Sequence, residues 1–470
     1  MQKSNLLFVV IFLLLNIVTH SQSKFIGKWL GELDIHGTKL RVVFNISESA
    51  EQVLKATLDS PDQSAFDIPV SEVSENGNTL LVKVKMIGAS YEGNLVNDST
   101  IVGEFNQGGM SFDITFKKTD VVKEKVKYQE PTKPYPYNEE EVKIENKEAK
   151  ITLAGTLTLP KTVKKHPAVI LVSGSGPQDR NEALLGHKPF LVLADYLTRL
   201  GFVVLRYDDR GVAQSTGDFS KATSLDFVTD ALSAIKYLQT REEVDIDKIG
   251  IIGHSEGGLI APIAASTSEE VKFIVLLAGT GVTGEEIIYE QTKAINKSSG
   301  LSEEFIHEYD RFIREMLPIV INAGDEESAR VQLREYLNKQ LQQLSDTFKR
   351  EAQLDSSSIE MTIQRSVNPW FRLFLTLDPQ DYLKKVKVPV LAINGSKDIQ
   401  VIPSQNLPKI EEALKESGNN DFIVMELEGL NHLFQKCTAC TFAEYSTLEE
   451  TFSPDALKVV GDWLKGRFLK

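Results

Sequence analysis

Apolar and polar positions alternate near the start of the chain in the manner of half-buried β-strands. Residues 39–46 and 79–87 show this partial alternation and are rich in β-branched and aromatic side chains. Residues 101–118 form two such runs around a Gly-Gly pair, which predicts a β-hairpin. Because helical spacing is absent, we expect residues 22–120 to form a small antiparallel β-barrel or sandwich.

A different pattern begins at about residue 141. The near-continuous apolar runs PAVILV, FVVL, KIGII and VKFIVLL are separated by amphipathic segments such as FVTDALSAIKYLQ. Strands of this kind lie in a parallel sheet that helices cover on both faces. Residues 141–470 are therefore predicted to be an α/β domain with a mostly parallel sheet, and ligands of such sheets bind at the carboxyl ends of the strands.

Two segments interrupt this scheme. Three prolines within KYQEPTKPYPYNEEE keep the chain extended, which predicts a linker over residues 121–140 between the two domains. Polar helical sequence replaces the strand–helix alternation after Gly279, and the strand pattern resumes at VKVPVLAINGS. We expect residues 281–387 to form a helical cap, inserted between two strands, over the strand ends.

The first residues have the features of a secretory signal peptide. Lys3 supplies a positive charge, an apolar run follows over residues 6–18, and the sequence THS offers small residues for cleavage after Ser21. We therefore expect residues 1–21 to be removed and the mature protein to be secreted or periplasmic. An uncut membrane anchor is the alternative. No later segment is apolar over a length that spans a bilayer.

Composition and charge narrow the choice of partners. The 470 residues are 41% hydrophobic and 25% charged, with a formal net charge of −14. This acidic balance argues against nucleic acid or an anionic membrane surface as the main partner. The length suggests about two to four domains. The oligomeric state is not defined by these patterns.

The pentapeptide Gly253-His254-Ser255-Glu256-Gly257 follows one of the apolar strands and precedes a helix. It has the G-x-S-x-G pattern of a nucleophile elbow, in which the serine backbone is strained and side chains at the glycine positions would collide with nearby backbone. Such a turn holds the hydroxyl at the sheet edge. Ser255 is therefore the predicted nucleophile, and a tight turn with an idle serine is the alternative.

A serine nucleophile needs a base, and the base needs an orienting carboxylate. His432 follows the strand FIVMEL, at the expected carboxyl end, and is the predicted base. Asp398 follows the strand PVLAIN and completes a known triad order, Ser-Asp-His. Asp378 precedes that strand and Glu428 is four residues from the histidine, so both are weaker candidates. The other histidines are excluded by their positions: His20, His36, His166, His187, His254 and His307.

Acyl transfer also needs hydrogen-bond donors for the oxyanion of the tetrahedral intermediate. One is expected to be the backbone N–H of Glu256, the residue after the nucleophile. The other is expected in the glycine-rich loop SGSGPQDRN, with Ser175 as the first choice and Gly174 as the second. No Lys-Ser or Lys-Thr pair follows this loop, so it is not a phosphate-binding P-loop.

Other conspicuous groups have simpler interpretations. Asp208 and Arg210 in YDDRG are expected to brace loops near the site. Trp370, Phe371 and Phe374 either line an acyl pocket or belong to the cap core, and the sequence leaves this open.

The chain has two cysteines, Cys437 and Cys440, so its stability does not depend on a disulfide framework. The pair can form one local bridge in an oxidising compartment or remain as two thiols. A zinc site is a weaker alternative, because two thiols and His432 leave the metal short of ligands. No metal ion or organic cofactor is predicted.

Residues 141–470 resemble the α/β-hydrolase superfamily, most of all the bacterial secreted esterases that carry an N-terminal β domain and a helical cap. The likeness rests on five ordered motifs: SGSGPQDRN, RYDDRG, GHSEGG, NGSKDIQV and GLNHLFQ. It implies a triad of Ser255, Asp398 and His432, the residues already chosen. The sequence departs from many relatives at Ser173, where they have His, and at Ala213, where they have Gly.

These observations predict a serine hydrolase that cleaves small-molecule carboxylic esters through an acyl-enzyme. The superfamily also contains peptidases, so a serine exopeptidase on the same triad is one alternative, with Glu256 or Glu285 binding the amino terminus of the substrate. A non-catalytic binding protein on a hydrolase scaffold, with the β domain as its binding part, is the other.

Overall fold

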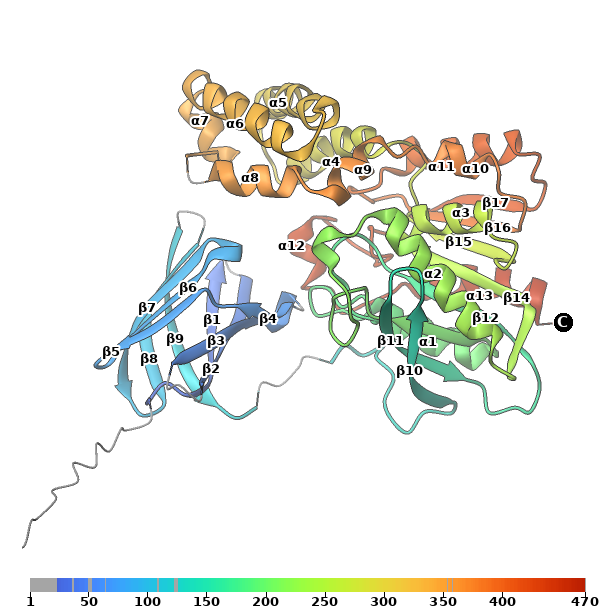
Figure 1. The fold of residues 1–470 in the computed structure, drawn as a ribbon, viewed down its shortest axis with the longest axis horizontal. Helices are drawn as coiled ribbons and strands as arrows, with labels where there is room; N and C mark the ends of the chain where they lie inside the picture. The colour runs from blue at the N-terminus through green and yellow to red at the C-terminus, as the bar shows by residue number, and fades with distance from the viewer. Residues whose placement is uncertain are drawn as a thin grey trace, which may run out of the picture. The chain divides into compact units, whose positions relative to one another are not determined.

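The computed structural model describes residues 23–469, apart from 36–37, 50–52, 64, 108–109, 122–125, 353 and 357. The predicted signal peptide, residues 1–21, and His36 lie outside the described residues. The chain forms two compact units that divide near residue 123 (Figure 1). Within the described ranges, no helix combines the length and the apolar character needed to cross a membrane.

The smaller unit is one antiparallel sheet of nine strands, in the order β4-β3-β2-β1-β9-β8-β7-β6-β5 (Figure 1). The strands are β1 (Gly27–Ile35), β2 (Thr38–Glu48), β3 (Leu54–Ser60), β4 (Ala65–Pro69), β5 (Glu72–Asn76), β6 (Thr79–Val84), β7 (Ala89–Asn97), β8 (Thr100–Gln107) and β9 (Met110–Thr119). In the sequence, the 3-10 turns η1 (Pro61–Gln63) and η2 (Lys85–Ile87) follow β3 and β6.

The sheet curves as a half-barrel around an aromatic core. Trp29, Phe44 and Phe116 are fully buried in it, and the rings of Phe44 and Phe116 lie 4.8 Å apart between centroids. The predicted hairpin is confirmed, because β8 pairs with β9 and places Gln107 opposite Met110. The all-β character expected from the alternation is thus present along this unit, where alternate side chains face the core.

The larger unit contains an eight-stranded sheet in the order β10-β11-β13-β12-β14-β15-β16-β17. β10 and β11 are antiparallel at one edge, and the strands from β13 to β17 are parallel. The strands are β10 (Asn138–Asn146), β11 (Ile151–Leu159), β12 (His166–Val172), β13 (Val203–Tyr207), β14 (Val244–His254), β15 (Phe273–Leu277), β16 (Val390–Gly395) and β17 (Phe422–Leu427).

Helices cover both faces of this sheet, which confirms the predicted α/β fold. One face packs against α1 (Pro189–Leu200) and α13 (Pro454–Phe468). The other packs against α2 (Ser224–Gln239), α3 (Gly257–Thr267) and α11 (Pro403–Glu416). The central strands are buried at every position, which explains why their sequences are near-continuous apolar runs.

Residues 126–137, within the segment predicted as a linker, pack against the larger unit. Gln129 Nε2 donates to the carbonyl oxygen of Phe452 at 2.7 Å, and Gln129 Oε1 accepts from the N–H of Phe452 at 3.0 Å. Tyr137 donates to Asp195 of α1 at 2.9 Å, and β10 follows directly. The prolines indicated an extended chain, but they did not indicate where that chain docks.

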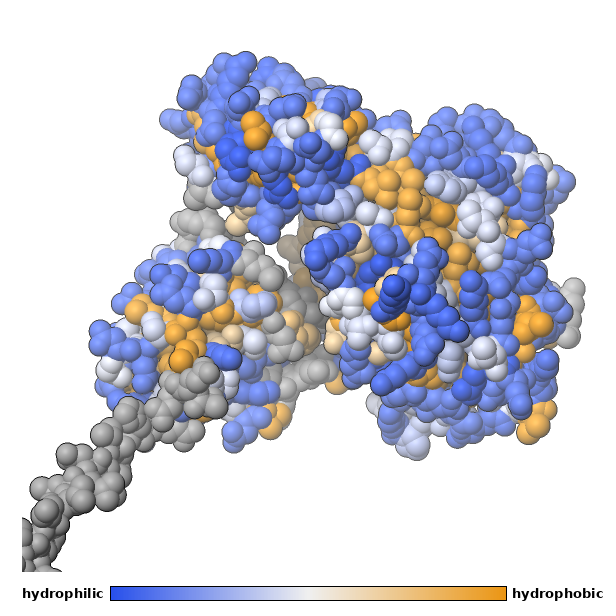
Figure 2. All heavy atoms as spheres, viewed as in Figure 1, coloured by the Kyte–Doolittle hydropathy of each residue, from blue (hydrophilic) through white to orange (hydrophobic). Residues whose placement is uncertain are grey.

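A helical block lies between β15 and β16, within the range predicted for the cap. It consists of α4 (Gly284–Ser298), α5 (Glu303–Asn322), α6 (Glu326–Gln343), α7 (Asp346–Glu351), α8 (Ser358–Ser366), α9 (Pro369–Thr376) and α10 (Gln380–Leu383). The block has its own apolar core, and Figure 2 shows that the outward face of α5–α7 is mostly hydrophilic. The remaining helices are η3 (Phe219–Lys221) and α12 (Phe442–Tyr445).

Candidate active site

The three predicted triad residues follow three strands that end at the same edge of the sheet. Ser255 comes directly after β14, Asp398 follows β16, and His432 follows β17. Parallel strands place their carboxyl ends on one edge, so the loops after them converge there. The loop with the predicted oxyanion donors follows β12, which pairs with β14.

The turn at Ser255 has the backbone geometry of a nucleophile elbow. Ser255 has a φ of +53°, in the left-handed region that favours glycine. A Cβ atom added at Gly253 would lie 2.0 Å from the carbonyl oxygen of Gly257, and one at Gly257 would lie 2.1 Å from that of Val172. Backbone therefore fills the space that a side chain would need at both glycines, which explains the G-x-S-x-G pattern.

His432 and Asp398 form a buried pair. His432 Nδ1 lies 2.7 Å from Asp398 Oδ2, and the two residues are 4% and 3% exposed. The other carboxylate oxygen accepts from the N–H groups of Gln400 at 2.7 Å and Val401 at 3.0 Å, which holds the carboxylate in place. Within the described chain, neither His432 Nε2 nor Ser255 Oγ has a hydrogen-bond partner. The imidazole is thus held through Nδ1, with Nε2 left as the available nitrogen.

The other carboxylates and histidines considered for the triad are either exposed or bonded to other groups. Glu428 is exposed, and Asp378 accepts a backbone N–H at the start of α10. His166 and His187 are buried and hydrogen-bonded through both ring nitrogens, and His307 is exposed on α5. Of the three carboxylates considered as partners for His432, the structure brings Asp398 to it.

The predicted oxyanion donors differ in whether their backbone N–H groups already have a hydrogen-bond partner. A Cβ atom added at Gly174 would lie 3.2 Å from Ser255 Cβ, so this loop approaches the nucleophile closely. The N–H of Gly174, however, donates to Glu182 Oε1 at 2.7 Å and is not available for an oxyanion. Gly174 was the second choice for the donor, and its hydrogen bond to Glu182 makes it a weaker candidate than Ser175. The N–H groups of Ser175 and Glu256 have no partner in the part of the chain that the structure describes.

His254 lies beside the nucleophile in the sequence, where it was not expected to act as the base, and its position predicted no other role. Its Nδ1 lies 2.8 Å from Glu182 Oε1, and its Nε2 lies 3.0 Å from the carbonyl oxygen of His432. Glu182, His254 and His432 are all buried. Burial lowers the pKa of His254, but the charge and hydrogen bond of Glu182 outweigh it, so the pKa is raised above its ordinary value. The two partners are 72 residues apart, and no local pattern links them.

The side chain of Glu256 connects the elbow to the helical block. Its Oε1 accepts from Ser224 Oγ at 2.5 Å and from Trp370 Nε1 at 2.7 Å. Ser224 begins α2, and Trp370 lies in α9. Burial raises the pKa of this carboxyl, although both hydrogen bonds lower it. The cap is therefore attached to the residue next to Ser255.

A second acid, the partly buried Asp209, lies with Glu256 at a small cavity of about 10 Å³. Ser173 Oγ and the N–H of Gln178 each donate to Asp209 at 3.0 Å. Ser173 thus ties the start of the loop after β12 to the loop after β13. Burial raises the pKa of Asp209 well above its usual range.

The three aromatic residues left open by the sequence fall into two groups. Phe371 packs in the core of the helical block. Trp370 and Phe374 stack with their ring centroids 5.2 Å apart, and Phe374 packs against a small apolar cluster that includes Val401, whose N–H donates to Asp398. Trp370 and Phe374 therefore lie beside the candidate site, where they can contact an apolar acyl group.

The acids and arginines of the neighbouring loops brace one another, as expected. Arg180 donates to both oxygens of Asp208, at 2.9 and 2.7 Å. Arg210 donates to both oxygens of Asp230, at 2.7 and 3.0 Å. Such two-point pairs fix loop geometry, and they leave these side chains with protein partners.

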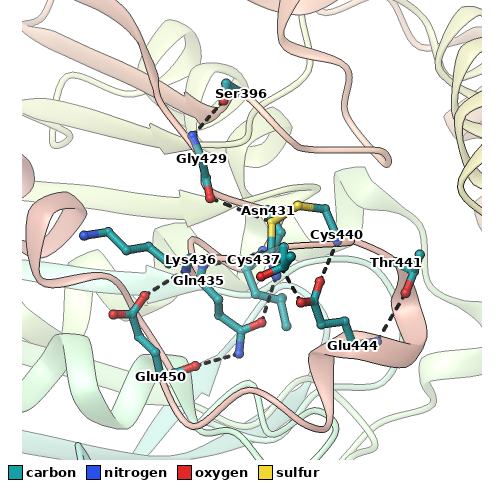
Figure 3. Close-up of a disulfide and its surroundings, with 12 residues drawn as sticks. Ser396, Gly429, Asn431, Gln435, Lys436, Cys437, Cys440, Thr441, Glu444 and Glu450 are labelled. Atoms are coloured by element: carbon teal, nitrogen blue, oxygen red, sulfur yellow. Dashed lines mark hydrogen bonds between the residues drawn. A yellow bond between two sulfur atoms is a disulfide. The ribbon is translucent and has the colours of Figure 1, made fainter.

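A disulfide closes the segment that follows His432 (Figure 3). It joins Cys437 to Cys440, and the N–H of Cys440 donates to Glu444 Oε2 at 2.5 Å. The N–H of Cys437 donates to the carbonyl oxygen of Gly429 at 3.3 Å. Because the two sulfurs are bonded to each other, they do not provide the thiolates that a zinc site would need.

Comparisons with known proteins agree with this architecture. A family model for X-Pro dipeptidyl-peptidase (S15 family) matches residues 134–432, more than half of the chain. Esterase EstD of Thermotoga maritima is 26% identical over 362 residues, covering 74% of this chain and 74% of that protein. The putative hydrolase YtaP of Bacillus subtilis is 34% identical over 134 residues, covering 24% of this chain and 44% of that protein.

Among solved structures, the Pyrococcus furiosus esterase Pf2001 is similar at 17% identity with a TM-score of 0.43, covering 71% of this chain and 92% of that one. The match to the family model begins just before β10 and extends through the elbow to His432. On that evidence the chain belongs to the X-Pro dipeptidyl-peptidase (S15) family, within the α/β-hydrolase superfamily.

Proposed function

We propose that this protein is a serine hydrolase that cleaves carboxylic esters through an acyl-enzyme on Ser255. The observation that carries the proposal is the buried 2.7 Å contact between His432 Nδ1 and Asp398 Oδ2, which leaves Nε2 available as a base. The elbow supplies a serine with a φ of +53° at the N-terminus of α3. Ser255 is the proposed nucleophile, His432 the base and Asp398 the orienting carboxylate.

The proposed reaction has two steps. His432 Nε2 takes the proton of Ser255 Oγ as this oxygen bonds to the ester carbonyl carbon, and the N–H groups of Ser175 and Glu256 hold the oxyanion. The C–O bond to the alcohol then breaks, and His432 gives its proton to the departing alkoxide. In the second step a water molecule loses a proton to His432 and attacks the acyl-enzyme. Breakage of the bond to Ser255 Oγ returns that proton to the serine and releases the acid.

The choice of esters over peptides rests on the relatives and on two carboxylates. EstD, similar over 74% of this chain, is named an esterase, whereas the family model carries the name of a dipeptidyl peptidase. An exopeptidase needs an anionic group for the amino terminus of its substrate. Glu285 Oε1 accepts from Tyr289 at 2.5 Å, and Glu256 Oε1 accepts from Trp370, so both acids already have partners. This favours the ester, and the X-Pro peptidase is the second candidate.

We also propose that residues 1–21 are cleaved and that the protein acts in the periplasm or outside the cell. The Cys437–Cys440 disulfide supports this location, since such bonds persist in oxidising compartments. Mass spectrometry of the exported protein should find Gln22 as the first residue. An N-terminal peptide that still contains Lys3 would contradict cleavage.

The activity is tested with purified residues 22–470 on p-nitrophenyl esters of increasing acyl length and on X-Pro p-nitroanilides. We expect turnover of the esters, weak cleavage of the anilides, and loss of both in the Ser255→Ala variant. Efficient anilide cleavage with weak ester turnover would establish the peptidase instead. Absence of labelling by a fluorophosphonate, together with no turnover of either series, would instead support a non-catalytic binding protein.

A further inference from the structure

Glu182 and His254 connect three loops of the candidate site. Glu182 lies in the oxyanion loop after β12, and its Oε1 accepts from the N–H of Gly174 at 2.7 Å. The same oxygen lies 2.8 Å from Nδ1 of His254, the residue before the nucleophile. Nε2 of His254 lies 3.0 Å from the carbonyl oxygen of His432, in the loop after β17. One side-chain pair therefore contacts the loops of the oxyanion donors, the nucleophile and the base.

The partners of His254 determine where its protons lie. A backbone carbonyl oxygen only accepts, so Nε2 must carry a proton to bond to His432. Glu182 Oε1 accepts from the N–H of Gly174, and an ionised carboxylate oxygen has a further lone pair that can accept from Nδ1 of His254. With Glu182 ionised, Nδ1 carries a proton as well. The arrangement is that of an imidazolium donating from both nitrogens to a carboxylate and a carbonyl.

We infer that Glu182 and His254 are positioning residues, and that His254 is a buried imidazolium which holds the oxyanion loop and the His432 loop on either side of the nucleophile elbow. Neither residue is proposed to touch the substrate. The inference rests on the proposed function for its catalytic consequence, whereas the protonation of His254 is independent of it.

The surroundings of His254 support this arrangement. The titratable groups that face it are Glu182, His432 and, at longer range, Asp398, and Phe434 packs against the ring edge with centroids 6.4 Å apart. The ring of His432 lies 4.8 Å away between centroids. A bare imidazolium there would oppose protonation of His432 during catalysis, so the carboxylate of Glu182 is needed to neutralise it.

The protonation is tested by nitrogen NMR on protein labelled with ¹⁵N-histidine. His187 provides an internal reference, because Nε2 lies 2.8 Å from the carbonyl oxygen of Tyr445 and Nδ1 lies 2.9 Å from the hydroxyl of Thr451, as in a neutral ring. At pH 7 we expect two protonated ring nitrogens for His254 and one for His187, with signals assigned from His254→Gln and His187→Gln. An unprotonated Nδ1 in His254 would overturn the inference, whatever the activity of the protein.

The positioning role is tested by kinetics on p-nitrophenyl acetate. Glu182→Ala removes the acceptor for Gly174 and His254, and we expect kcat to fall about 100-fold with KM changed less than about threefold, since a misplaced loop costs about that much. Glu182→Gln keeps an oxygen for Gly174 but not the negative charge for His254, so we expect it to recover about tenfold of the loss and to leave kcat about tenfold below the wild type. Glu130→Gln is the matched control, a buried carboxyl paired with Lys188 at 3.2 Å, and should retain the wild-type kcat.

The outcomes separate this inference from the proposed function. Full activity of a folded Glu182→Ala variant, or equal losses in the alanine and glutamine variants, would overturn the positioning role. If Glu182→Ala fails to fold, Glu182→Gln decides the role: a fall in kcat without a change in KM supports it, and unchanged kcat overturns it. Wild-type turnover by Ser255→Ala would instead overturn the proposed function and leave the NMR result intact.

Discussion

Trp370 Nε1 donates to Glu256 Oε1 at 2.7 Å, and this bond joins a helix of the cap to the residue after the nucleophile. The backbone N–H of Glu256 is a proposed oxyanion donor, whereas its buried side chain holds the cap. The cap and the proposed oxyanion donor are therefore linked through one residue.

Replacing Trp370 by Phe keeps an aromatic ring for the stack on Phe374 and removes the indole donor. We expect the free energy of unfolding to fall by about 1–3 kcal/mol, because Glu256 loses a partner where water is excluded. KM should rise more for long-chain esters than for acetate. Trp463→Phe is the matched control, since Trp463 Nε1 is buried without a partner in the described chain. Urea unfolding should show a smaller effect there, and equal effects would contradict the role of the bond.

Asp398 is expected to act through His432. Asp398→Asn can keep the shape of the site but no longer stabilises the imidazolium, so kcat should fall by about 10³–10⁴-fold with a folded protein. Glu428→Gln, four residues from His432 and exposed, should remain within about twofold of wild type. Steady-state rates on p-nitrophenyl acetate measure both. If the two substitutions had similar effects, Asp398 would not be the orienting residue.

His187 should make stability depend on pH. Burial lowers its pKa to about 4 in the folded protein, against about 6.5 in the unfolded chain. Between these values the unfolded state binds more protons, so stability rises with pH from about 4 to 6.5, is fully present above that window, and is lost on acidification by about 3 kcal/mol.

Urea unfolding from pH 4.5 to 7.5 tests this dependence. His187→Gln should be less stable at pH 7, since two hydrogen bonds are changed, but its stability should fall less on acidification than that of the wild type. His307→Gln, at an exposed position on α5, should keep the wild-type slope. An unchanged slope in His187→Gln would show that another group is responsible.

The disulfide should contribute little to global stability, because Cys437 and Cys440 are only three residues apart. Closing so short a loop restricts the unfolded chain by about 2 kcal/mol. The variant with both cysteines replaced by serine should therefore fold and lose about that amount in urea unfolding. Reductant should lower the stability of the wild type to a similar level and leave the double variant unchanged. A loss of folding on reduction would contradict this.

Much of the candidate site could be read from the sequence because its residues follow strands. The apolar runs before Ser255, Asp398 and His432 identify three strands, and the carboxyl ends of parallel strands meet at one edge. Burial of a strand gives a recognisable hydrophobic pattern in the sequence, and a strained turn gives a recognisable motif. For the same reason the hairpin of β8 and β9 was visible in advance.

The tertiary structure alone decided which side chains bond to one another. The pair Glu182–His254, the bond from Trp370 to Glu256, and the docking of Gln129 on Phe452 join segments that are far apart in the chain. The sequence offered Gly174 as an oxyanion donor, but it did not indicate that the N–H of Gly174 donates to Glu182. A hydrogen bond depends on distance and direction in space, to within a few tenths of an ångström, and the order of residues carries no record of either for loops that meet only after folding.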